Sequence, residues 1–274
     1  MALCYMNGEF LPLQKAVLPV SDYVIQRGVG VFESICTFRR RPLMLSPHLE
    51  RLARSAGSAG IAMPLPLEDL KAVIRDGIGK MKDECLVRPY ITGGDVFVDG
   101  EFPSPRLFVL FEKVRKPSPD VYDRGVLLFP VDRGRHTPGV KSTDYMLSYS
   151  GHSQCREAFE ILYCPDGEIT EAAHSTFFLY KEGKLVTAPL SRVLKGTTRE
   201  IVLQLAAERG IPVEERCPLL PEVEEAQEAF ITGSVKEIVP VVRIGDRIVG
   251  SGTPGPVTRM LHGTFLEEIV RWLE

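Results

Sequence analysis

Four short segments in the second half of the chain carry side chains that can react or hold an anion. Residues 139–145 contain Lys141, residues 167–172 contain Glu171, residues 193–199 contain Thr197 and Thr198, and residues 231–237 contain Ser234 and Val235. A lysine amine can form a Schiff base or move a proton, and hydroxyls at a helix start favour an anion. Taken singly, each segment also fits a solvated lysine, a helix cap or a turn. Their meaning therefore depends on their order and spacing.

Composition excludes several classes of function. The 274 residues include 33 basic and 36 acidic side chains, a formal charge of −3, which gives no reason to expect nucleic acid or an anionic membrane as partner. The six cysteines are scattered and form no CxxC pair, so we expect reduced thiols and no structural metal site. The N-terminus has no signal-peptide pattern, and no apolar run approaches the ~20 residues of a membrane span. Together these features predict a cytoplasmic protein.

The patterning predicts alternating strands and helices in two domains. Alternation over 30–38 indicates a strand, Ser46 an N-cap, and 67–81 a second helix. Further helices are expected over 145–159, 198–209 and 259–273. The charged, proline-containing stretch 113–120 favours a boundary. We predict a domain over 1–115, a linker over 116–120 and a larger domain over 121–274.

The order and spacing of the four segments resemble the class IV aminotransferase family of fold-type IV PLP (pyridoxal 5′-phosphate) enzymes. This family includes branched-chain aminotransferase, D-amino-acid aminotransferase and aminodeoxychorismate lyase. The first half agrees, through Asn7-Gly8, RGVGVFE at 27–33 and HLERL at 48–52. The resemblance implies an α/β (α+β) fold with a small N-terminal α/β domain and a larger C-terminal α/β pseudo-barrel domain. It also implies PLP between the domains and a homodimer.

The resemblance assigns roles to particular residues. Lys141 matches the lysine that holds the cofactor and then serves as the catalytic base, and Glu171 matches the partner of the pyridine nitrogen. The phosphate is expected to be held by Thr197, Thr198, Ser234, Val235 and Arg51, although Arg51 also fits a plain surface position. Tyr145 matches a tyrosine near the phenolic oxygen. Leu194 matches a residue on the ring face, and core packing explains it equally well.

The substrate pocket follows no familiar subgroup. Phe32, Arg88 and Tyr90 are candidate pocket walls, and Arg88 could pair with a substrate carboxylate or with an internal acid such as Glu33. The loop over 92–102 lacks the Arg and His pair of D-amino-acid aminotransferases. The leading hypothesis is transamination between a branched-chain-like or D-amino acid and a 2-oxo acid. The alternatives are a PLP-dependent lyase such as aminodeoxychorismate lyase, and a PLP-binding homologue without turnover.

Overall fold

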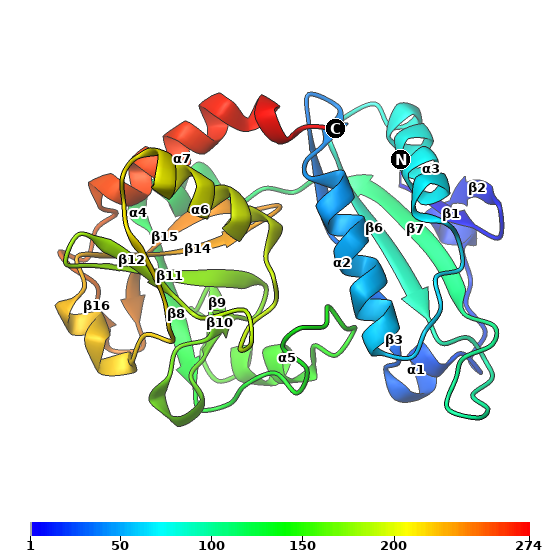
Figure 1. Cartoon of the computed structure of the whole chain (residues 1–274), viewed down its shortest axis with the longest axis horizontal. Helices are drawn as coiled ribbons and strands as arrows, with labels where there is room; N and C mark the ends of the chain where they lie inside the picture. Colours follow the sequence, from blue (N-terminus) through cyan, green and yellow to red (C-terminus); the bar gives the residue numbers. More distant parts are fainter. Residues whose placement is uncertain (1) are drawn as a thin grey trace. The chain divides into compact units, whose positions relative to one another are not determined.

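A computed structural model describes residues 2–274, which fall into two compact units (Figure 1). The N-terminal unit comprises the residues through Arg115, together with Val140–Asp144 and Arg271–Glu274. The C-terminal unit comprises Lys116–Gly139 and Tyr145–Val270. Within the range expected to be a linker, 116–120, Pro119 already begins helix α4 (Pro119–Arg124). No helix within residues 2–274 has the length and apolar character needed to cross a membrane.

The N-terminal unit is built on an antiparallel sheet. Among the described residues it has seven strands, in the order β2-β1-β7-β6-β4-β5 with β3 also paired to β6. The strands are β1 (Leu3–Met6), β2 (Glu9–Pro12), β3 (Gly30–Phe32), β4 (Ile35–Phe38), β5 (Arg41–Pro42), β6 (Cys85–Thr92) and β7 (Arg106–Lys113). The helices are α1 (Tyr23–Arg27), α2 (Leu45–Ser58) and α3 (Leu67–Lys80).

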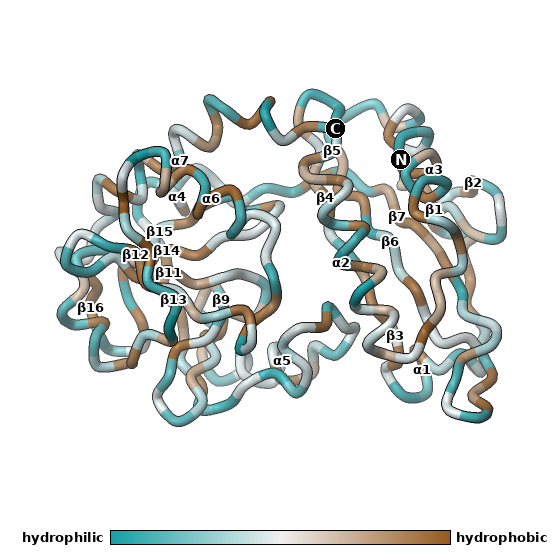
Figure 2. Tube along the Cα trace, in the orientation of Figure 1, coloured by the Kyte–Doolittle hydropathy of each residue, from teal (hydrophilic) through white to brown (hydrophobic). Residues whose placement is uncertain are grey.

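Burial alternates from residue to residue along β6, because one face of this sheet is covered by helices. Cys85, Val87 and Ile91 are fully buried against α2 and α3, while the alternate residues are half-buried. Figure 2 shows hydrophobic and hydrophilic stretches alternating along α2, whose buried leucines complete the core.

The C-terminal unit is built on a second sheet that closes on itself. In the described chain its nine strands run β10-β9-β8-β15-β14-β11-β12-β13, with β16 beside β15, and the pairing of β10 with β11 closes the ring. The strands are β8 (Val126–Val131), β9 (Glu160–Tyr163), β10 (Glu171–Ala172), β11 (Ser175–Lys181), β12 (Lys184–Thr187), β13 (Val213–Glu215), β14 (Glu228–Gly233), β15 (Glu237–Ile244) and β16 (Arg247–Ile248). The helices are α4, α5 (Met146–His152), α6 (Thr197–Glu208) and α7 (Pro256–Glu268). This closed sheet confirms the expected pseudo-barrel.

Several predicted boundaries are wrong, for identifiable reasons. The strand expected over 30–38 is broken between β3 and β4, where the Glu33 side chain turns into the interior. The helix expected to start after Ser46 starts at Leu45, because Met44 takes a left-handed conformation and Ser46 bonds the Glu274 carboxylate instead.

Two helices in the C-terminal unit also differ from expectation. The helix expected over 145–159 is α5 and stops at His152. The last helix starts three residues early, at Pro256, because the Glu228 carboxylate accepts hydrogen bonds from the Val257 and Thr258 amides at 2.9 and 2.7 Å.

Helix α3 offers a matched pair of glycines that tests the packing of the N-terminal unit. A Cβ on Gly77 would lie 2.1 Å from Cζ of the buried Phe111, whereas one on Gly79 would meet no described atom within 4 Å. We expect Gly77→Ala to destabilise the protein by about 1–3 kcal/mol through overpacking. Gly79→Ala should stabilise it by up to about 1 kcal/mol through helix propensity. Urea unfolding measures both, and equal stability of the two variants would contradict the packing described for Phe111.

Candidate active site

Lys141 lies on a segment that is fixed to β3 by backbone hydrogen bonds. The Phe32 amide donates to the Lys141 carbonyl at 3.0 Å, and the Thr143 amide donates to the Gly30 carbonyl at 2.9 Å. The Lys141 amide donates to Ser55 Oγ at 3.2 Å. Its Nζ then lies over the Phe32 ring, 4.7 Å from the centroid. A lysine held on both sides in this way is unlike a solvated loop lysine.

Arg51 belongs to a buried charge cluster in the same unit. Its Nε and Nη2 donate to the two carboxylate oxygens of Glu33 at 2.7 and 2.6 Å, and His48 Nδ1 lies 2.6 Å from the same carboxylate. Burial alone would raise the pKa of Glu33, but Arg51 and His48 hold it well below its usual range. Burial lowers the pKa of His48, only partly offset by Glu33, so we infer that its neutral ring donates to the carboxylate. The surface alternative for Arg51 is therefore wrong.

Glu171 is buried on β10 and faces a cation that the sequence did not identify. Nε of Arg135 lies 2.9 Å from Glu171 Oε1 as a charge pair, and Arg135 also donates to the Ala173 carbonyl. The Leu194 amide points to the other carboxylate oxygen at 3.4 Å, and the Leu194 side chain is half-buried. Burial would lower the pKa of Arg135, yet Glu171 and Tyr145 outweigh it and raise that pKa.

Tyr145 joins this group from the residue before α5. The Arg135 guanidinium lies over its ring at 5.6 Å, and the His174 ring stacks on it at a centroid distance of 5.0 Å. Burial raises the pKa of Tyr145, only partly offset by Arg135. The phenol therefore remains protonated at neutral pH and can donate a hydrogen bond.

The start of α6 and the end of β14 meet in the C-terminal unit. Thr176 and Thr232 are paired across β11 and β14, and a Cβ on Gly196 would lie 2.6 Å from Thr176 Oγ1. Thr197 and Thr198 form the buried first turn of α6. The Oγ1 atoms of Thr198 and Thr232 are buried, and neither forms a hydrogen bond with any residue that the structure describes. Buried hydroxyls in proteins normally form a hydrogen bond, so we infer that a polar ligand would be the partner of both atoms.

Ser234 and Val235 follow β14 directly, in the loop that leads to β15. Both residues are half-buried. The loop places a hydroxyl and backbone amides beside the strand end that carries Thr232. Helix start, strand end and loop therefore have the composition of an anion cup.

The expected substrate residues lie on the half-buried face of the N-terminal sheet. Phe32 stacks on Tyr90 at 5.1 Å between ring centroids, and Tyr90 stacks on Phe108 at 4.9 Å. Arg88 pairs with Glu112 on the neighbouring strand β7. Arg88 therefore has an internal acid as its partner, as one of the two alternatives expected, but that acid is Glu112 and not Glu33, which is engaged by Arg51 and His48.

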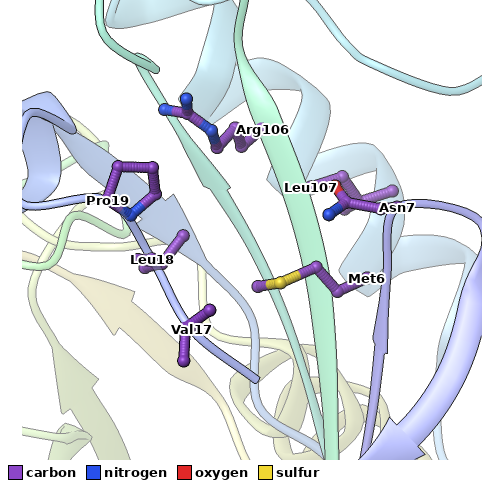
Figure 3. Close-up of a pocket in the computed structure, with 7 residues that line it drawn as sticks. All are labelled: Met6, Asn7, Val17, Leu18, Pro19, Arg106 and Leu107. Atoms are coloured by element: carbon purple, nitrogen blue, oxygen red, sulfur yellow. The ribbon is translucent and has the colours of Figure 1, made fainter. Parts of the chain in front are cut away.

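A pocket of about 420 Å³ on the N-terminal unit has none of these residues in its lining (Figure 3). It is lined by Met6, Asn7, Val17, Leu18, Pro19, Arg106 and Leu107. Its only charged lining group, Arg106, is already paired with Asp22 and Asp95. Within residues 2–274, no three His, Cys, Asp or Glu side chains are grouped to hold a metal ion.

Comparisons with known proteins identify the family of the chain. The family model described as amino-transferase class IV matches residues 30–244. A putative branched-chain-amino-acid aminotransferase of Methanocaldococcus jannaschii is 32% identical, over 98% of this chain and 96% of that protein. The chain belongs to the class IV aminotransferase family.

Other class IV aminotransferases extend the likeness. A D-alanine aminotransferase of Bacillus licheniformis is 29% identical, over 96% of each chain. The crystal structure of the Escherichia coli branched-chain amino acid aminotransferase superposes with a TM-score of 0.90 at 25% identity, covering 99% of this chain and 98% of that one. The family and these relatives, which are named aminotransferases, together identify the chain as an aminotransferase and confirm the expected fold and enzyme class. The substrate, which differs between these relatives, is not fixed by membership.

Two glutamates paired with arginine test the buried cluster of this class IV aminotransferase. Glu33→Gln leaves Arg51 buried without its counter-charge, so we expect a loss of about 3–5 kcal/mol in unfolding free energy at pH 7. Glu112→Gln, which removes the half-exposed partner of Arg88, should cost at most about 1 kcal/mol.

The pH dependence gives a second readout. The pKa of folded Glu33 lies below its ordinary value of 4.5, so its contribution is complete above pH 4.5 and declines as the pH falls below it. The difference between wild type and Glu33→Gln should therefore narrow in acid. Denaturant unfolding over a pH series measures it, and a constant difference would refute the assignment.

Proposed function

We propose that this aminotransferase carries PLP on Lys141 and moves an amino group between an amino acid with an apolar side chain and a 2-oxo acid. The observation that carries the proposal is the fixed position of Lys141. Its backbone is bonded to β3 and to Ser55, and its amine lies 4.7 Å above the Phe32 ring. This environment gives the amine a defined direction, which covalent attachment and proton transfer both need.

The residues on the C-terminal unit fit the cofactor. When bound, its pyridine ring accepts the electrons released as a proton leaves Cα of the amino acid. Glu171 would keep the ring nitrogen protonated, and Arg135, 2.9 Å from its carboxylate, holds that carboxylate in place. Tyr145 would donate to the phenolic oxygen, and Leu194 would pack on the ring. The unpartnered hydroxyls of Thr198 and Thr232 support a phosphate at the start of α6.

Further residues complete the proposed set. Thr197, Ser234 and Val235 would add a hydroxyl and backbone amides to the phosphate cup. Arg51 would donate to the phosphate from its guanidinium, whose plane is fixed by the two bonds to Glu33. Lys141 would also serve as the base that moves the proton from Cα.

The apolar row beside Lys141 favours a hydrophobic substrate side chain. Phe32, Tyr90 and Phe108 present stacked rings, and the charge of Arg88 is already balanced by Glu112. An acidic side chain placed there would lose hydration without gaining a cation. We therefore propose a branched-chain-like amino acid, with Phe32, Tyr90 and Arg88 as parts of the pocket wall.

We extend the proposal to a cytoplasmic homodimer. The loop after β6 exposes Val96, Phe97 and Val98 at 47%, 51% and 51%, which is a large apolar group for an isolated chain. The six cysteines are all free thiols in the described chain, as in a reducing compartment. Sedimentation equilibrium should give twice the chain mass, and cell fractionation should place the protein in the cytosol. A monomer, or recovery in a membrane or secreted fraction, would overturn this part.

Replacing Lys141 tests the proposed chemistry. Lys141→Ala should abolish the visible absorbance band of the lysine-linked cofactor in protein mixed with PLP. We expect its turnover of leucine with 2-oxoglutarate to fall by at least about 10³-fold, because attachment and proton transfer are both lost. Lys195→Ala removes a half-exposed lysine paired with Glu200 and should leave the spectrum unchanged.

The dependence on an acceptor separates the possible reactions. An aminotransferase should stop after one equivalent of product when no 2-oxo acid is supplied, and restart when one is added. Continuous release of ammonia or pyruvate from an amino acid alone would indicate a lyase. Identical spectra for wild type and Lys141→Ala would show that the cofactor is held elsewhere.

A further inference from the structure

The loop between β14 and β15 has an unusual backbone for its sequence. Gly233 pairs with Glu237, so Ser234, Val235 and Lys236 form a three-residue connection. Glu237, the residue that closes it, has φ +59°. A non-glycine residue in this left-handed region costs about 1–2 kcal/mol. The loop therefore needs other interactions to keep its shape.

Lys236 supplies one such interaction through a buried carboxylate on a distant strand. Its Nζ pairs with Glu160, which lies on β9 and is 4% exposed. The same carboxylate accepts hydrogen bonds from the His174 amide at 2.8 Å and from Ser175 Oγ at 2.7 Å. Glu160 thus ties the loop after β14 to the turn that follows Glu171.

Glu237 supplies a second interaction, at the residue that closes the loop. Its buried carboxylate accepts from Lys116 Nζ at 2.6 Å and lies 2.8 Å from His262 Nε2. The Tyr122 hydroxyl donates to the Lys236 carbonyl at 3.2 Å, and its ring stacks on His262 at 4.8 Å. The loop is consequently held at Lys236 and at Glu237, the residue that closes it.

The charge of Lys236 is neutralised within the protein, so its role differs from that of a residue that binds the phosphate directly. Burial alone would raise the pKa of Glu160, but Lys236 and His174 hold it well below its usual range, so the carboxylate is ionised. The positive charge of Lys236 is therefore balanced by the carboxylate of Glu160. A buried ion pair of this kind is costly to break, because it leaves one charge unpaired.

We propose that Lys236 and Glu160 are positioning residues that hold Ser234 and Val235 in the shape that receives the cofactor phosphate. The proposal rests on the PLP function proposed above. The pair acts by fixing the backbone of the loop, so its contribution should appear only for ligands that carry the phosphate. Preorganised backbone donors bind an anion without the entropy loss of ordering a mobile loop.

The test compares two ligands that differ only in the phosphate. PLP and pyridoxal are titrated into the full-length apoprotein for wild type, Lys236→Met, Lys236→Arg and Glu160→Gln. We expect Lys236→Met and Glu160→Gln to weaken PLP binding by about 10- to 100-fold, the range typical of residues that orient a binding group. Pyridoxal binding should stay within about twofold. Lys236→Arg keeps the charge and should largely restore PLP affinity.

The control removes a comparable pair that has no link to the loop. Lys184→Met breaks the half-exposed ion pair with Glu214 on the same unit and should change neither affinity. If Glu160→Gln does not fold, the two Lys236 variants carry the test.

Three outcomes would overturn the inference: equal losses for PLP and pyridoxal, unchanged PLP affinity in Lys236→Met, or tighter PLP binding in Glu160→Gln. The last would show that Lys236, once released, binds the phosphate directly. Failure of wild type to bind PLP would instead refute the proposed function, and the two failures are thereby distinguished.

Discussion

A carboxylate that is buried in a protein must meet a cation or several donors, and this constraint organises the residues of interest. Among the described residues, Glu33 is paired with Arg51, and Glu171 with Arg135. Each pair fixes a side chain that would otherwise have many rotamers. The charges that the proposed chemistry requires are therefore held in place before any ligand arrives.

The same constraint explains how segments far apart in the sequence are brought together. Glu160 joins a strand, the turn after Glu171 and the loop after β14, across 76 residues of chain. Backbone hydrogen bonds do the equivalent work for Lys141, which is held against β3. In the C-terminal unit, ion pairs thus hold together loops that backbone hydrogen bonds alone do not fix.

Some of this could be predicted from the sequence. The apolar spacing over 198–209 identifies helix α6, because burial on a helix follows its local period. The resemblance of the segments around Lys141 and Glu171 identified the family. The start of α2 could not be predicted, because the Ser46 hydroxyl donates a hydrogen bond to the carboxylate of the distant residue Glu274 and therefore does not cap the helix.

The partners of the site residues were also beyond the sequence. Arg135 lies in a polar loop, where no periodicity distinguishes a buried arginine from a solvated one. Glu160 follows Phe159 at the start of an apolar strand, and nothing near it in the chain announces the pairing with Lys236. A charged residue in an otherwise apolar strand was the one available signal, since such a residue is rarely buried without a partner.

The attachment of the cofactor to Lys141 can be tested directly by trapping the bond between the lysine and PLP with a reductant. The purified protein is mixed with PLP, reduced with borohydride and digested, and the modified peptide is sequenced by mass spectrometry. We expect one modified lysine per chain, at Lys141 in the segment 139–145. Stable modification at a different lysine, or none in protein that turns over amino acids, would contradict it.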